Sequence, residues 1–131
     1  MAAPQEILYA DLDLNLTPHP VTGDVVVKTG AGAITQALKT VVQTNFFERP
    51  FHSDVGADLR AQMFELFSPI VAKAIERNVR RCVDNDEKRA QLLKLVVDER
   101  RAQNGVRVQI TYQPLHLVTP VTVDLFLKRV R

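Results

Sequence analysis

Apolar residues in the first half of the chain recur with the period of an α-helix. The first set is spaced by four, three and one, and consists of Ile34, Leu38, Val41 and Val42. This spacing predicts one apolar face of a short helix. The pattern breaks near Asn45, and Pro50 disfavours helical backbone at the residue before it. We therefore predict a helix that ends before a connecting loop.

Two further helices are predicted after this loop. The second is expected to begin around Asp54 or Gly56, with inward apolar positions at Leu59, Met63, Phe64, Leu66 and Phe67. Ser68 and Pro69 then supply an N-cap and a first helical residue, which together predict a new helix. Its inward positions are Val71, Ala74, Ile75, Val79, Cys82 and Val83.

The last third of the chain changes to a period of two. Three sets of apolar residues alternate with polar ones: Leu93, Leu95 and Val97; Val106, Val108, Ile110 and Tyr112; Val121, Val123, Leu125 and Leu127. Asn104-Gly105 is a strong turn signal between the first two sets. Such alternation is typical of an antiparallel meander with one buried face.

The order of these elements predicts one α+β domain over residues 1–131. Residues 1–32 are rich in proline and glycine and are expected to be irregular, with a short strand at Val25–Val27. Residues 33–89 form the helical part and residues 90–131 the β-meander. About three helices then pack on one face of a small antiparallel C-terminal β-sheet.

Composition excludes several classes of protein. Hydrophobic residues make up 46% of the 131 residues and charged residues 24%, which is ordinary globular usage and not that of a disordered chain. The net charge of +2 is a small surplus for a dedicated nucleic-acid binder. No apolar run approaches the roughly 18 residues of a membrane span, and the first residues do not resemble a signal peptide. We expect a soluble, unprocessed protein without a disulfide, since Cys82 is the single cysteine.

Few residues are spaced for cofactor or catalytic chemistry. His19, His52 and His116 lie in three different zones, so we expect no metal site, and no glycine pattern for a nucleotide cofactor is present. A glycosidase needs two facing carboxylates. The candidates close in sequence are Glu48, Asp54, Asp58 and Glu65, and nothing in the sequence pairs any two of them across a cleft. A lysozyme-like hydrolase that degrades peptidoglycan is kept as the alternative function.

Three features suggest contacts with other molecules. The segment 45–56 carries three phenylalanines among ionisable groups, and it is either a loop anchored in the core, with Arg49 bonding backbone carbonyls, or a contact point for a partner chain. The last strand ends in Lys128-Arg129-Val130-Arg131, where the charges either protect a sheet edge or flank an edge that accepts a strand. A basic flank is read as a solvated face, with phosphate, nucleic-acid or partner binding as the minority interpretation: Lys73, Arg77, Arg80 and Arg81.

Several ordered segments resemble a known family. They are Leu8-Tyr9-Ala10-Asp11-Leu12-Asp13, Glu48-Arg49-Pro50-Phe51, Gly56-Ala57-Asp58-Leu59, Gln62-Met63-Phe64-Glu65, Ser68-Pro69 and Ile75-Glu76-Arg77-Asn78-Val79. Together they resemble the small baseplate wedge proteins of contractile-tailed bacteriophages, a lysozyme-like family by label that also includes the TssE component of type VI secretion. The chain departs from the family at Val55, where an aromatic residue is common.

The resemblance implies a structural protein and not an enzyme. It implies a fold similar to the assembly domain of sheath subunits, a place in the virion tail baseplate after synthesis in the host cytoplasm, and several copies in a six-fold assembly. The implied partners are other wedge proteins and tail sheath subunits, without a cofactor, small-molecule substrate, nucleic acid or membrane. The implied contact with the wedge core bundle consists of Glu48, Arg49, Pro50 and Phe51. The implied docking edge for sheath strands consists of Val121, Val123, Leu125, Leu127 and Arg129.

Overall fold

The computed structural model describes residues 9–129. Leu8, Val130 and Arg131, which the sequence analysis used, lie outside the described residues. In chain order the elements are β1 (Ala10–Leu12), β2 (Val27–Thr29), α1 (Gly30–Gln43), α2 (Arg60–Phe64), α3 (Pro69–Asp86), β3 (Ala90–Arg100), a 3-10 turn (Arg101–Gln103), β4 (Gly105–Pro114) and β5 (Val121–Lys128).

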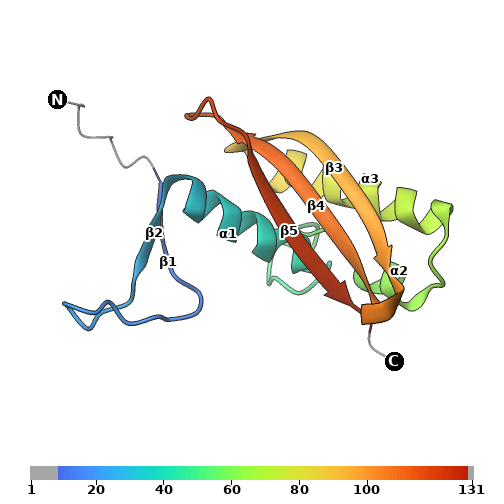
Figure 1. The fold of residues 1–131 in the computed structure, drawn as a ribbon, viewed down its shortest axis with the longest axis horizontal. Helices are drawn as coiled ribbons and strands as arrows, with labels where there is room; N and C mark the ends of the chain where they lie inside the picture. Colours follow the sequence, from blue (N-terminus) through green and yellow to red (C-terminus); the bar gives the residue numbers. More distant parts are fainter. Residues whose placement is uncertain (1–8, 130–131) are drawn as a thin grey trace.

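The C-terminal strands form an antiparallel sheet with the order β3-β4-β5. Helices α1 and α3 lie against this sheet, while β1 and β2 form a separate two-stranded ribbon beyond the start of α1 (Figure 1). The buried core joins residues of α1, α3, β4 and β5, including Leu38, Ile75, Ile110 and Leu125. The predicted α+β class, with helices packed on a C-terminal antiparallel sheet, is confirmed.

The central strand is fixed to the first helix by a buried tyrosine. Tyr112 of β4 is fully buried. Its hydroxyl lies 3.1 Å from the carbonyl oxygen of Ala31 and 2.7 Å from the hydroxyl of Thr35, both on α1. A buried phenol needs such partners, because an unpaired hydroxyl in the core costs free energy. The contact sets the position of α1 over the sheet.

Local signals in the sequence are found where they were expected. The hydroxyl of Ser68 accepts a hydrogen bond from the amide of Val71, and Pro69 is the first residue of α3. Asn104 has a φ of 50°, the left-handed backbone that a tight turn between β3 and β4 requires. The predicted cap and the predicted turn are confirmed.

The second helix is shorter than its predicted span. It begins at Arg60 and not at residues 54–56, because Gly56 has a φ of 116° and Asp58 a φ of 48°, neither of which is helical. The predicted inward positions Phe64 and Leu66 are 59% and 74% exposed. The other three predicted positions, Leu59, Met63 and Phe67, lie in the core or pack against it as expected, although the helix itself covers only Arg60–Phe64.

A β-bulge changes the inward face of β3. The register against β4 shifts between Leu92 and Lys94, so Leu93 is not part of the core face and is 49% exposed. Leu95 and Val97 pack against the core as predicted, and Leu92 takes the place of Leu93 there. The prediction that Leu93 faces inward is wrong because the extra residue reverses the alternation on one side of the bulge.

The N-terminal segment is more regular than predicted. β1 pairs with β2, which lies at 27–29 and not at 25–27. The Gln36 side chain of α1 donates to the carbonyl of Leu12 at 2.7 Å and accepts from the amide of Leu14 at 3.2 Å. These two bonds hold the end of β1 against α1, a long-range contact that local sequence patterns do not encode.

Candidate protein-binding surfaces

The loop between α1 and α2 has a fixed base. The amide of Gly56 donates to the carboxylate of Asp86, at the end of α3, over 3.0 Å. The amide of Asp58 donates to the carbonyl of Thr44, just past α1, over 3.4 Å. A Cβ atom at Gly56 would overlap that same carbonyl. The backbone at Gly56 therefore packs so closely against the backbone at Thr44 that only glycine fits. Ala57 beside it is fully buried.

Charged groups fix the body of the loop. The carboxylate of Glu48 accepts from the backbone amide of Asn45 at 3.1 Å and from its side-chain amide at 2.8 Å. These hydrogen bonds hold the pKa of Glu48 below its ordinary value. The guanidinium of Arg81 on α3 lies 4.9 Å from the ring centre of Phe46, within the range of a cation–π contact. The loop is thus held by its own polar side chains and by a contact with α3.

The tip of the loop displays apolar side chains to solvent. Phe47 is 83% exposed and Phe51 is fully exposed. Both have a φ of 65°, a left-handed backbone that is unfavourable for a bulky residue. Arg49 and Pro50 between them are exposed too, and within residues 9–129 the Arg49 side chain forms no hydrogen bond or ion pair. The interpretation of segment 45–56 as a loop anchored in the core holds for its two ends, at Phe46 and Gly56, but it is wrong for the tip and for Arg49.

The outer edge of β5 is open. β5 pairs with β4 on one side, and no strand in the described part of the chain pairs with its other side. Val123 and Leu125 are buried in the core, and Val121 and Leu127 pack against it. Of the five residues predicted for strand docking, these four therefore direct their side chains inward. The groups available to a partner at this edge are the main-chain N–H and C=O groups of β5.

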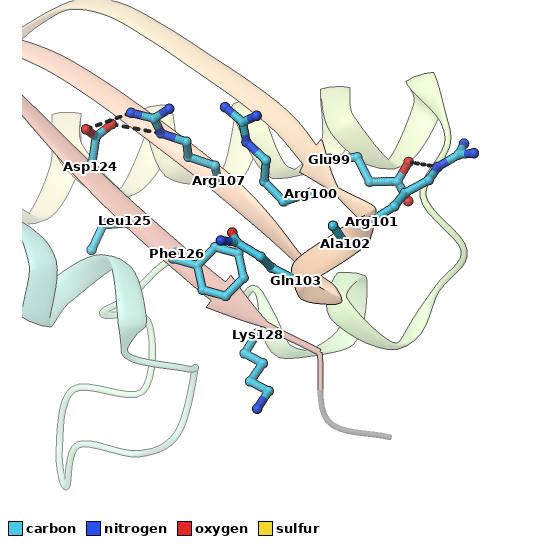
Figure 2. Close-up of a pocket in the computed structure, with 10 residues that line it drawn as sticks. All are labelled: Glu99, Arg100, Arg101, Ala102, Gln103, Arg107, Asp124, Leu125, Phe126 and Lys128. Carbon is cyan, nitrogen blue, oxygen red and sulfur yellow. Dashed lines mark hydrogen bonds and ion pairs between the residues drawn. The ribbon is translucent and has the colours of Figure 1, made fainter.

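Two hollows flank the C-terminal half of β5. One, of about 910 Å³, lies at the hairpin end of the sheet and is lined by residues of β3, β4, β5 and the turn (Figure 2). The other, of about 460 Å³, lies between β5, the end of α1 and α2, and includes Val42, Leu59 and Met63. Phe126 and Lys128 line both hollows, so the edge of β5 has open space on both sides.

Both carboxylates that line the first hollow are paired with arginines. The guanidinium of Arg107 and the carboxylate of Asp124 lie 2.9 Å apart, and Arg101 and Glu99 form a second pair at 2.8 Å (Figure 2). The Arg107 pair holds the pKa of Asp124 below its ordinary value. The ring of Phe126 covers Gly105 on the neighbouring strand. This surface is a paired, structural one and not a cluster of unpaired catalytic carboxylates.

Other candidate chemistry finds little support. Among residues 9–129, no three His, Cys, Asp or Glu side chains are grouped to hold a metal ion. Burial raises the pKa of the Cys82 thiol to about 12, which makes it a poor nucleophile. A glycosidase general acid needs a raised pKa, whereas the pKa of Glu48 is lowered. No described helix has the length and hydrophobicity of a membrane span.

Comparison with known sequences gives one consistent family. The model of the family described as baseplate wedge protein gp25 matches residues 28–116. The baseplate wedge protein gp25 of Enterobacteria phage T4 is 33% identical over 90 residues, which is 69% of this chain and 67% of that protein. The matched range of the family model includes the whole α1–α2 loop and ends before β5.

Solved structures share the fold. A chain of the anti-feeding prophage baseplate has a TM-score of 0.71 and 21% identity, covering 84% of this chain and 88% of that one. A Geobacter sulfurreducens protein described as a candidate tail lysozyme has a TM-score of 0.65 and 21% identity, covering 72% and 88%. A chain of the postcontracted pyocin R2 baseplate has a TM-score of 0.55 and 16% identity, covering 90% and 98%.

Proposed function

Since the chain belongs to the baseplate wedge protein gp25 family of contractile tails, we propose that it is a structural, non-enzymatic subunit that joins other chains through two surfaces. The first is the loop tip, defined as residues 47–51. The second is the open edge of β5. The tip receives a wedge subunit, and the edge receives an extended segment of a sheath subunit. The protein is located in the tail baseplate, in several copies around a six-fold axis.

The observation that carries this proposal is the exposed, strained loop tip on a fixed base. Two phenylalanines stand in solvent with unfavourable backbone, while Gly56 and Asp58 lock the base of the same loop. Strained, exposed aromatic residues are retained where they serve a site. Aromatic and arginine side chains dominate binding energy at protein interfaces. Glu48, Arg49, Pro50 and Phe51 therefore form the proposed contact with the wedge core.

The geometry around β5 supports strand addition. An added strand would bond to the open main-chain groups of β5, and its side chains would alternate between the two faces of the sheet. The two hollows on either side of Phe126 and Lys128 offer space for those side chains. Val121, Val123, Leu125 and Leu127 contribute by holding the edge in place from the core side. Arg129 lies next to the turn, since its amide donates to the carbonyl of Asn104 over 2.9 Å.

Cysteine cross-linking in assembled tails tests the edge. The variant Lys128→Cys places a reactive thiol on β5 at a residue that lines both hollows. We expect a photoactivatable cross-linker on this thiol to capture a sheath subunit, identified by mass spectrometry. Cys82 gives little background, because it is buried and its thiol has a pKa of about 12.

The matched control is Lys94→Cys, an exposed lysine on β3 at the opposite edge of the sheet. This variant is expected to capture no sheath subunit. Equal capture from both positions, or none from position 128 in tails that assemble normally, would contradict strand docking at β5.

A further inference from the structure

The exposed face of α3 carries a band of cations. The buried residues Val71, Ile75, Val79, Cys82 and Val83 define the inward side of this helix. The opposite side carries Lys73, Arg77, Arg80 and Arg81, all exposed. These four residues, which we call the α3 stripe, follow one another at helical spacing along about three turns. The side chains of the α3 stripe are exposed, and the contact of Arg81 with the Phe46 ring joins the stripe to the loop between α1 and α2.

The stripe keeps an excess of positive charge. Glu76 is the one acid among these turns, and it contacts both Lys73 at 3.0 Å and Arg80 at 3.7 Å. Within residues 9–129, Arg77 forms no ion pair. Between Lys73 and Arg81, four cations and one carboxylate leave a local surplus of three positive charges, and the exposed Asp84 at the end of the stripe lowers it to two. A surplus of this kind attracts a partner of opposite charge.

The stripe is continuous with the proposed wedge contact. Arg81 at its C-terminal end lies over the ring of Phe46, the residue before the loop tip. The amide of Gly56, at the base of the same loop, bonds to Asp86 of the same helix. A partner chain that covers Phe47 and Phe51 would therefore lie beside the C-terminal turns of α3. From there the α3 stripe extends along the helix, away from the loop tip.

We propose that the α3 stripe binds an acidic polypeptide segment of the same wedge subunit that covers the loop tip, an inference that rests on the proposed function. The tip supplies apolar affinity, and the stripe supplies electrostatic attraction and orientation. A polypeptide is favoured over nucleic acid because Glu76 lies within the stripe and Asp84 borders it. These carboxylates would repel a phosphate backbone, which carries a negative charge at every nucleotide, whereas the acidic side chains of a polypeptide can be spaced to avoid them.

Association kinetics at two salt concentrations test the inference. The probe is the purified wedge subunits of the same tail, immobilised on a biosensor, with the full chain in solution. For the native chain we expect the association rate to fall about tenfold between about 50 and 200 mM salt. For Lys73→Glu/Arg77→Glu we expect about a tenfold slower rate at low salt and little further change with salt. The neutral Lys73→Gln/Arg77→Gln variant is expected to lie between the two.

The control with the same change in net charge is Lys39→Glu/Lys94→Glu, two exposed lysines on α1 and β3. It is expected to change the rate by less than about twofold. Equal slowing by this control would overturn the inference, because it would show an effect of net charge alone. A short DNA duplex that binds the native chain but not the α3 variant, with wedge association unchanged, would overturn it as well.

A loop variant separates this inference from the proposed function. Phe47→Ser/Phe51→Ser is expected to speed dissociation and to keep the native salt dependence of association. If the loop variant behaves so while the stripe variant matches its control, the inference fails and the proposed function stands. If the loop variant binds as the native chain does, the loop contact fails, whatever the stripe variant shows.

Discussion

Replacing Phe47 and Phe51 together by serine is expected to weaken binding to the wedge subunits by about a thousandfold, while the chain stays folded. Both rings are exposed in the free protein, so their loss removes no packing from the core. Each buried phenylalanine ring contributes about 1.5–3 kcal/mol when a partner covers it. The measurement is the dissociation constant for the purified wedge subunits, with the free energy of unfolding from chemical denaturation as the check on folding.

The matched control for this variant is Leu115→Ser/Val118→Ser. These two apolar residues are 67% and 89% exposed in the connection between β4 and β5. Their replacement removes a comparable exposed apolar surface at a site away from the loop tip, so binding is expected to be unchanged. A Phe47→Ser/Phe51→Ser protein that binds within about threefold of the native chain would rule out the tip as an interface anchor.

The variant Gly56→Ala is expected to lose about 3 kcal/mol of the free energy of unfolding. Its φ of 116° is a conformation that L residues rarely adopt, and the added methyl group would overlap the carbonyl of Thr44. Relief of that overlap requires movement of the backbone that bonds to Asp86. The measurement is chemical denaturation, and weaker binding to wedge subunits is expected to accompany the loss, because the loop tip is displaced.

The control for Gly56 is Gly32→Ala on α1. Gly32 is exposed, its Cβ would meet no atom within 4 Å, and alanine suits a helix better than glycine. This variant is expected to be as stable as the native chain or more stable by about 0.5 kcal/mol. If Gly56→Ala is no less stable than Gly32→Ala, the loop base is not the rigid support that the account requires.

The strength of local signals decided which parts of the fold could be predicted. The cap at Ser68, the turn at Asn104 and the alternation in β4 are local patterns with one structural solution, and they appear where expected. The apolar positions between Gly56 and Phe67 also matched a helical period. Positive φ angles at Gly56 and Asp58 delay the start of the helix to Arg60, and the accompanying long-range contact of this backbone with Thr44 is not shown by a sequence pattern.

The candidate surfaces were predictable in part for the same reason. Aromatic residues beside Glu48, Arg49 and Pro50 marked the loop as unusual, but residue types alone could not separate an anchor from a contact site. Exposure of Phe47 and Phe51 made that distinction. For β5, the period of two predicts a strand, and the order of a three-strand meander places this last strand at the sheet border, as observed. The hollows beside Phe126 depend on packing against α1 and α2, which no local pattern encodes.

The central claim is that other polypeptides cover both the loop tip and the edge of β5. A cryo-electron microscopy structure of the assembled baseplate that contains this chain tests both parts at once. We expect a strand from another chain hydrogen-bonded along Val121–Lys128, and a wedge subunit packed on Phe47 and Phe51. Solvent at both surfaces in a complete baseplate would contradict the account.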